Sequence, residues 1–476
     1  MMRSILPALA FSIALAAPAF AADPLTFGRF GEVKAIMPAG DPQSVALLLS
    51  GAKGWDADAD AAAAALTAKG ALVLGIDWKA YKAELDRDGA GCVYPAADLQ
   101  GLAQYGEKTL GLKRYHQPIL VGIGEGASAV YPAFAQGPED TFKGALAAGF
   151  CPTLKTVKPM CKGHSADLHS KSGSGGFSYA PASSGLDNFV ALNGVDGQTC
   201  AAADVAAYVA GMPGAKTIAA DSSMPLADQI AAAYGDLVAT QTAFEQAQKS
   251  GDGAPSAPGP TPETPAHVDI SALSDLPLTV VPSEGAPKSY AIFLTGDGGW
   301  AGIDQSISAS LAAKGIEIVG FNTLDYYWEA KSAYQTAADI NRVLDAIRAS
   351  DAGAKVMLVG YSFGAEVAPV FYPQLADASK AMISRMVLLV PGALAVFEFS
   401  SSYWLGDEPS EGDNVADAVK ADANVPVLCI YSSDDDGACP ALAASPPPNV
   451  TLKEMGEGHH FGGDYDALAS VILGEG

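Results

Sequence analysis

The sequence has few basic residues and few histidines, and these shortages argue against two classes of function. Lysine and arginine together number 28 against 53 aspartates and glutamates, so the formal net charge is −25. Nucleic-acid phosphates demand a basic surface, so this charge argues against a nucleic-acid-binding protein. The sequence also has no C-x-x-C pair and no histidine-rich stretch. We therefore expect neither a metal site nor a cofactor.

Long hydrophobic runs are missing beyond the N-terminus. No later stretch reaches about 18 uninterrupted apolar residues, the length that a membrane-spanning helix needs, so we expect a soluble mature protein. Residues 1–21 combine Arg3, an apolar run and the small-x-small site Ala19-Phe20-Ala21. This pattern predicts a secretory signal peptide that is cleaved near Ala21. A retained N-terminal anchor is the alternative.

Cysteines are also few, numbering six in 476 residues. In an exported chain they can pair, but sequence alone does not choose among the possible connectivities. The local pairs Cys151–Cys161 and Cys429–Cys439 are plausible from their spacing. They would leave Cys92 to pair with Cys200.

The chain is too long for one ordinary hydrophobic core, and its two halves repeat each other. Residues 45–75 and 290–320 are identical at eleven of 31 positions. Each reads as an apolar strand, a glycine turn, a helix and a second strand, which predicts a parallel sheet. Between the halves, SGDGAPSAPGPTPETPA reads as a linker. We predict a signal peptide over 1–21, a first domain over 22–249, a linker over 250–268 and a second domain over 269–476.

The second half contains a G-x-S-x-G motif at Gly360, Ser362 and Gly364. A buried strand precedes it and a helix can follow, as in the nucleophile elbow of α/β hydrolases. The alternative is a plain glycine turn. An elbow serine requires an acid and then a histidine later in the chain.

Both residue types follow in that order. An apolar strand ends in three aspartates, of which we prefer Asp435 over Asp434 and Asp436 as the acid. Near the C-terminus, His459 is our preferred base and His460 the alternate. The histidine would take the Ser362 proton, and the aspartate would orient the imidazole. The alternative for adjacent histidines is a solvated loop.

The remaining catalytic requirement is a pair of donors for the oxyanion. We expect the Phe363 amide to supply one and the backbone of Asp297 and Gly298 the other. In the first half the serine position is Gly124, and the segment that matches the histidine loop has no histidine. The sequence therefore predicts two tandem α/β-hydrolase-like domains, of which the N-terminal one is degenerate. That domain would bind, shield or dock.

A long segment after the stretch VLLVPGAL mixes aromatic and acidic residues over 395–419. Aromatic rings can cover a lipid or a cation, and carboxylates can pair with amines. An acidic loop that only keeps the surface soluble is the alternative. The expected substrate-binding residues, from this segment and the glycine loop, are Trp300, Trp404, Asp407 and Glu408.

The stretches LTGDGGW, VGYSFGAEVAPVFYPQL, SSDDDGAC and GEGHHFGGDYD together resemble the VirJ/AcvB family of bacterial exported proteins. The two-domain length resembles the longer, AcvB-like members. The resemblance implies a periplasmic hydrolase of lysyl-phosphatidylglycerol that is associated with virulence and type IV secretion. It places the nucleophile on Ser362, the acid among residues 434–436 and the base on His459 or His460. Ser432 departs from the family pattern, which tends to have glycine there.

Three hypotheses follow. The first is a serine esterase that acts on an aminoacylated phospholipid at the periplasmic face of the membrane. The second is a carboxylesterase or peptidase with another substrate. The third is a secretion-linked binding protein on a hydrolase scaffold, with secretion-system components as its partners.

Overall fold

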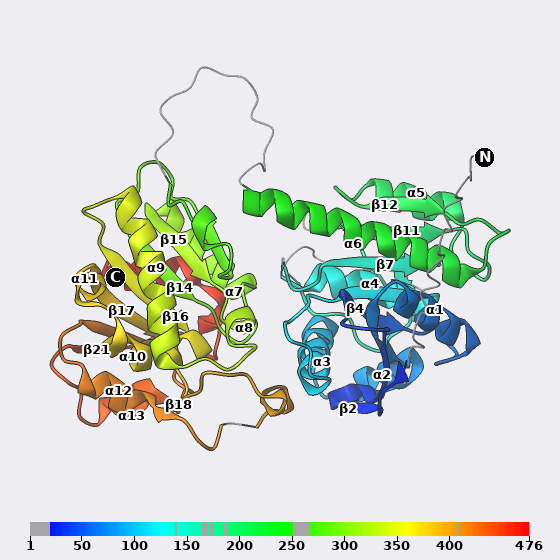
Figure 1. Ribbon diagram of the computed structural model, residues 1–476. Coiled ribbons are helices and arrows are strands. Elements are labelled where there is room, and N and C mark those ends of the chain that lie inside the picture. The colour runs from blue at the N-terminus through cyan, green and yellow to red at the C-terminus, as the bar shows by residue number, and fades with distance from the viewer. Residues whose placement is uncertain are drawn as a thin grey trace, which may run out of the picture.

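The computed structural model describes residues 20–138, 140–163, 170–171, 176–183, 186, 188–250, 267–407 and 409–475. They form two lobes, each built around its own sheet with helices on both faces (Figure 1). The expected leader and linker lie almost entirely outside the described residues. Phe20 and Ala21, the end of the expected leader, form the edge strand β1.

The N-terminal sheet has the strand order β1-β3-β5-β4-β6-β7-β11-β12, and β2 also pairs with β3. From β5 to β12 all neighbours are parallel, whereas β3 runs antiparallel to β5. The central strands are almost entirely apolar, as expected where helices bury both faces of a sheet. The strands are β1 (Phe20–Ala21), β2 (Leu25–Phe27), β3 (Gly31–Met37), β4 (Ser44–Leu49), β5 (Ala71–Ile76), β6 (Ile119–Ile123), β7 (Gly144–Ala148), β11 (Phe189–Asn193) and β12 (Lys216–Ala219).

The C-terminal sheet repeats this plan with the order β13-β15-β14-β16-β17-β20-β21. Again the first of these strands, β13, is antiparallel and the others are parallel. The prediction of an α/β protein with two mostly parallel sheets is confirmed. The strands are β13 (Leu278–Val281), β14 (Ser289–Leu294), β15 (Ile316–Phe321), β16 (Val356–Tyr361), β17 (Ile383–Leu389), β20 (Val427–Tyr431) and β21 (Val450–Glu454).

The helices divide into two layers in each lobe. In the first lobe α1 and α6 cover one face of the sheet, and α2, α3 and α4 cover the other. These helices, with α5, span Ala57–Ala68 (α1), Trp78–Arg87 (α2), Pro95–Thr109 (α3), Glu125–Gln136 (α4), Ala202–Ala210 (α5) and Leu226–Ser250 (α6). The last of them, α6, is the long helix at the end of the first half.

In the second lobe α7 and α14 cover one face, and α8, α9, α10, α12 and α13 the other. Ser332 and Gln335 form a capping box that fixes the start of α9. The helices are α7 (Gly302–Ala313), α8 (Thr323–Tyr326), α9 (Ala333–Ser350), α10 (Phe363–Phe371), α11 (Asp377–Lys380), α12 (Val415–Ala421), α13 (Ala438–Ala443) and α14 (Tyr465–Leu473). None of the helices in the described ranges is both long and apolar enough to cross a bilayer.

Short elements complete the two lobes. In the first, a small sheet has the order β8-β10-β9, and in the second β18 pairs with β19. These strands are β8 (Thr153–Leu154), β9 (Ser170–Lys171), β10 (Phe177–Ser178), β18 (Leu394–Ala395) and β19 (Asp413–Asn414). The 3₁₀ helices are η1 (Gly28–Phe30), η2 (Ser271–Leu273), η3 (Tyr372–Gln374), η4 (Ser401–Leu405) and η5 (Phe461–Gly463).

All six cysteines form disulfides, which indicates an oxidising compartment outside the cytoplasm. The predicted pair Cys429–Cys439 is confirmed. The other two predicted pairs are wrong, because Cys92 bonds Cys161 and Cys151 bonds Cys200. Cys151 and Cys200 follow the neighbouring strands β7 and β11, so the sheet brings together residues that are distant in sequence.

Candidate active site

Ser362 lies in a sharp turn between β16 and α10. Its φ of 50° and ψ of −117° put it in a strained conformation that few non-glycine residues adopt. A Cβ on Gly360 would lie 2.4 Å from the Gly364 oxygen, and one on Gly364 would lie 2.3 Å from the Leu294 oxygen. Both glycines of the motif are therefore sterically required, as a nucleophile elbow demands.

The glycine loop after β14 lies against this turn. A Cβ on Gly296 would lie 3.5 Å from the Ser362 Cβ. The Gly296 N–H donates to Asp304 Oδ1 at 3.2 Å, and the Asp304 side chain is buried beneath the loop. Burial raises the pKa of Asp304 to about 8. Phe363 is the first residue of α10, so its N–H has no partner within the helix and is available to an oxyanion.

Of the three aspartates after β20, Asp435 is the half-buried one, and Asp434 and Asp436 are exposed. Asp435 Oδ1 accepts the Gly437 N–H at 3.0 Å. Its Oδ2 is buried and has no hydrogen-bond partner among the described residues. Burial raises the pKa of Asp435, and nearby His459 opposes that rise. A buried carboxylate oxygen without a donor is what the acid of a triad offers to an imidazole.

Asp434 forms a hydrogen bond between two loops. Its Oδ1 accepts the Gly458 N–H at 3.0 Å and so ties the aspartate loop to the histidine loop. Bonds from Ser432 and then Gly458 lower the pKa of Asp434. Ser432, the residue that departs from the family pattern, is thus part of the loop's hydrogen bonding.

His459 lies above the strand that leads to Ser362. The Tyr361 hydroxyl donates to the His459 carbonyl oxygen at 3.3 Å, and the two ring centroids are 5.4 Å apart. Although the residue as a whole is exposed, surrounding protein atoms desolvate its ring and lower the pKa of His459. The charges of Asp297 and then Asp435 oppose this lowering of the His459 pKa most strongly. The His460 ring centroid lies 6.5 Å from that of His459.

The structure therefore brings His459, Asp435 and the Ser362 turn to one edge of the sheet. No hydrogen bond joins the three side chains among the residues that the structure describes. Such contacts are often loose in a free enzyme and tighten when substrate binds. The individual catalytic assignments stay predictions.

An aromatic cluster stands beside the elbow. The Phe363 ring centroid lies 4.2 Å from that of Phe399 and 6.3 Å from that of Tyr403. Trp404 continues the cluster, because its ring lies 5.9 Å from Phe399 and 5.8 Å from Trp328. The aromatic part of the predicted substrate segment is thus packed next to Ser362.

The other expected substrate residues are placed differently. Trp300 packs on the sheet, where a Cβ on Gly320 would lie 2.2 Å from its ring. Asp407 lines an open cavity of about 610 Å³, together with Ser402, Gly406, Pro409, Ser410 and Glu411. Glu408 lies outside the described residues. Within the described part of the chain, no cluster of three or more histidine, cysteine or acidic side chains could hold a metal ion.

The sequence analysis did not predict that side chains of the first lobe reach the candidate active site. Helix α3 of the first lobe extends Gln100 and Gln104 to the glycine loop of the second, where they donate to Gly298 O and Asp297 O. The only signal in the sequence is the four-residue spacing of these side chains, which places them on one helix face.

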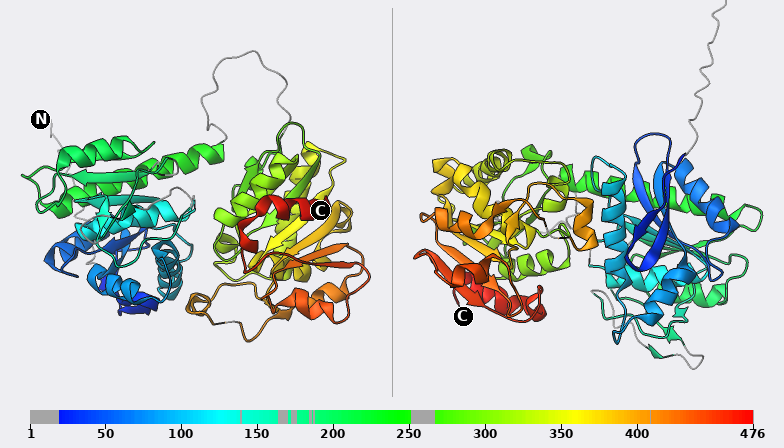
Figure 2. Two further views of the ribbon diagram at one scale, coloured as in Figure 1. Left: turned by 180° about the vertical axis from the view of Figure 1, so that it is seen from behind. Right: turned by 90° about the horizontal axis from the view of Figure 1, so that it is seen from below.

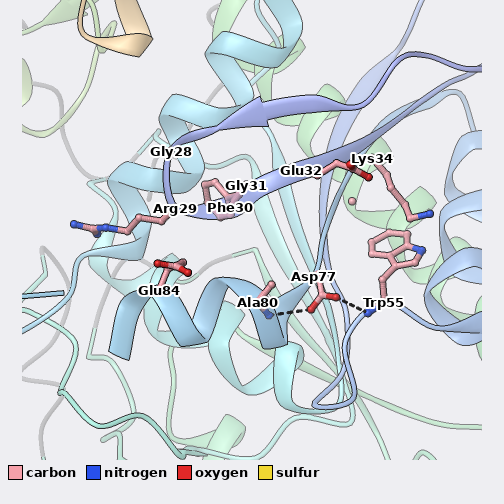
Figure 3. A pocket seen from close by; sticks show the side chains of 11 residues that line it. Gly28, Arg29, Phe30, Gly31, Glu32, Lys34, Trp55, Asp77, Ala80 and Glu84 are labelled. Carbon is pink, nitrogen blue, oxygen red and sulfur yellow. Dashed lines mark hydrogen bonds between the residues drawn. The ribbon is translucent and has the colours of Figure 1, made fainter. Parts of the chain in front are cut away.

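The first lobe has the equivalent turn but no serine in it. Gly124 stands where the second lobe has Ser362. Elsewhere in this lobe, a cavity of about 550 Å³ is lined by Phe30, Lys34, Trp55, Asp77 and neighbouring residues. Figure 3 shows Asp77 bonded to the Trp55 and Ala80 amides beside this cavity. The lining contains no serine, cysteine or histidine that could act as a nucleophile or base.

The strand order of the second lobe, with a sharp serine turn after β16, three aspartates after β20 and two histidines after β21, is that of the α/β-hydrolase fold. Residues 288–475 match the family described as "Bacterial virulence protein (VirJ)". The resemblance to VirJ seen in the motifs is confirmed over this range. No curated protein matches the chain.

Several solved structures are similar to about two fifths of the chain. The esterase domain of a Rhodothermus marinus protein has 15% identity and a TM-score of 0.30, over 42% of this chain and 89% of that one. Est1E from Butyrivibrio proteoclasticus has 14% identity and a TM-score of 0.31, over 42% and 91%. A serine hydrolase homologue from Coxiella burnetii has 15% identity and a TM-score of 0.29, over 42% and 90%. At these values the likeness says nothing about substrate.

Proposed function

We propose that the protein is a periplasmic serine hydrolase that cleaves the aminoacyl ester of lysyl-phosphatidylglycerol. The observation that carries the hydrolase proposal is the strained Ser362 turn, together with a buried Asp435 oxygen at the same edge of the sheet that has no donor among the described residues. A serine held at positive φ between two obligatory glycines is costly in a plain turn. In a nucleophile elbow the same strained backbone has a function, because it presents the serine hydroxyl to substrate.

The chemistry proceeds in two transfers. His459 accepts the Ser362 hydroxyl proton while Oγ bonds to the ester carbonyl carbon. The N–H groups of Phe363 and Gly298 stabilise the oxyanion, and collapse breaks the bond to the glycerol oxygen, which takes the proton from His459. Water then attacks the lysyl-enzyme with His459 again as base, which releases lysine and restores Ser362. Asp435 orients the imidazole and stabilises its charged form.

The proposed substrate suits the charges near the elbow. Lysyl-phosphatidylglycerol presents two amines, and the Asp297 carboxyl lies close enough to His459 to influence the pKa of that residue. Asp407 and Glu411 line the open cavity beside η4. Tyr403 and Trp404 are partly exposed and pack on the buried rings of Phe363 and Phe399, so they offer an apolar surface to the acyl chains or the lysyl methylenes. The substrate assignment also draws on the resemblance to AcvB-like proteins.

The test is incubation of the purified protein with vesicles of lysyl-, alanyl- and unmodified phosphatidylglycerol, followed by measurement of free amino acid. We expect lysine release by the wild type and none by Ser362→Ala. Hydrolysis of simple esters without lysine release would instead support a carboxylesterase with another substrate. No hydrolysis of any ester would support a binding protein on a hydrolase scaffold.

A further inference from the structure

Helix α3 belongs to the first lobe in sequence, yet one of its faces meets the second lobe. In Figure 1 it stands at the edge of the first lobe that faces the second, and Figure 2 shows it there from below. Gln100, Gln104 and Lys108 follow each other at intervals of four residues and so share one face of α3. All three side chains donate hydrogen bonds across the boundary between the lobes.

The two glutamines donate to backbone carbonyls of the glycine loop, whereas Lys108 bonds outside that loop. Gln100 Nε2 lies 3.4 Å from Gly298 O, and Gln104 Nε2 lies 3.5 Å from Asp297 O. Lys108 Nζ bonds to Trp328 O at 2.5 Å and to Glu398 Oε1 at 3.0 Å. Gln104 is only 3% exposed, so its amide is committed to this boundary.

A buried anchor fixes the far end of this contact. Trp328 of the second lobe is 1% exposed, and its indole N–H donates to the Leu112 carbonyl of the first lobe at 2.7 Å. The Tyr115 ring lies 5.4 Å from the Trp328 ring. Because Trp404 also packs against the cores of both lobes, the aromatic cluster beside Ser362 is continuous with this anchor.

The two glutamines bond to the peptide groups of the glycine loop from which we expect an oxyanion donor. In a trans peptide the C=O and N–H groups point in opposite directions. A carbonyl of Asp297 held by Gln104 therefore turns the Gly298 N–H away from α3. The stretch from Gly296 to Gly299 contains three glycines, which restrict their own backbone little. Its conformation thus depends on outside contacts.

We propose that Gln100 and Gln104 of the degenerate domain are positioning residues that hold the oxyanion loop of the catalytic domain. This inference rests on the proposed hydrolase function. It gives the first lobe a role in catalysis although it contributes no reacting group. The loop is held from two sides, by Asp304 from its own lobe and by α3 from the other.

The test uses the full chain with Gln100→Ala/Gln104→Ala, assayed on a soluble activated ester. We expect kcat to fall about tenfold or more with KM within about twofold, because misplaced donors weaken only transition-state binding. The rate of Ser362 labelling by a fluorophosphonate should fall in parallel. Lys108→Ala is the matched control, because it removes a contact across the same boundary without touching the glycine loop, and its kcat should stay within about twofold of the wild type.

An isosteric pair separates hydrogen bonding from packing. Gln100→Glu/Gln104→Glu keeps the side-chain shape but replaces the donating amide groups with carboxylates, so it should lose kcat as the alanine pair does. Wild-type kcat in both paired variants, or equal losses in the pairs and in Lys108→Ala, would overturn the inference. A wild type that neither hydrolyses esters nor reacts with the fluorophosphonate would instead overturn the proposed function. The two failures are therefore distinguishable.

Discussion

The turns at Gly124 and Ser362 have nearly the same backbone in the two lobes. Gly124 has φ 57° and ψ −114°, and Ser362 has φ 50° and ψ −117°. Each backbone N–H donates to the end of the next strand, to Ala148 O at 2.8 Å and to Leu389 O at 2.9 Å. The elbow geometry is therefore a property of the sheet and the flanking glycines. It persists where the nucleophile is missing.

The glycine loops show where the lobes do differ. Trp55 packs on Gly75 as Trp300 packs on Gly320, so the tryptophan serves the scaffold in both. In contrast, the position of the buried acid Asp304 is occupied by Ala59 in the first lobe. The lobe with the serine also has a buried carboxyl beneath its loop and a helix of the other lobe against it. Hydrogen bonds that hold the glycine loop are thus found in the lobe that has the serine.

The largest expected effect comes from making the second elbow like the first. Ser362→Gly and Ser362→Ala should each lower the hydrolysis rate by about a thousandfold or more, since loss of a triad nucleophile typically costs at least that. Glycine adopts positive φ freely, so the melting temperature of Ser362→Gly should not fall. Ester hydrolysis and thermal denaturation are the measurements. Residual activity above about a thousandth of wild type would refute the nucleophile assignment.

The second-largest expected effect is on kcat when the proposed triad acid, Asp435, is replaced. Asp435→Asn should lower kcat about a thousandfold to ten-thousandfold, because the asparagine favours the wrong imidazole tautomer. Asp434→Asn and Asp297→Asn are the controls and should lose far less. If Asp297→Asn were the more damaging change, the acid would come from the glycine loop instead.

The pH profile sharpens the role of His459. Burial lowers the pKa of His459 below its usual value of 6.5, so the neutral base persists into mildly acidic solution. Activity should fall as pH drops through that lowered pKa, with an inflection of kcat/KM below pH 6.5. An inflection clearly above this value would show that His459 is not the base.

The smallest effect concerns Asp304, which the first lobe lacks. Its pKa is raised in the folded state to about 8, so the folded chain binds the extra proton that the unfolded chain releases. Stability contributed by this group is therefore lost as pH rises from about 4 towards 8. Asp304→Asn should flatten that slope, measured by urea unfolding at several pH values. Asp304→Ala leaves the Gly296 N–H buried without an acceptor and should cost about 1–3 kcal/mol.

The sequence predicts those features that repeat or that lie close together in the chain. The βαβ repeat, the elbow glycines and the order of serine, acid and histidine all depend on local pattern, and the structure places these elements at one sheet edge. The cross-lobe contacts of α3 were not predictable, because nothing in the sequence near Gln100 marks its partner loop. Two disulfide pairs were predicted wrongly for the same reason, because the order of the strands in the sheet, which is not a local pattern, decides which cysteines lie close together.

The most direct measurement is fluorophosphonate labelling of the full chain, followed by mass spectrometry of its peptides. In the wild type we expect label on Ser362 alone. In Gly124→Ser, which puts a serine into the first elbow, we again expect label on Ser362 only, because the segment of that lobe that matches the histidine loop has no histidine to activate it. Label on residue 124, on any other residue of the first lobe, or on no residue at all would contradict the assignment of catalysis to the second lobe.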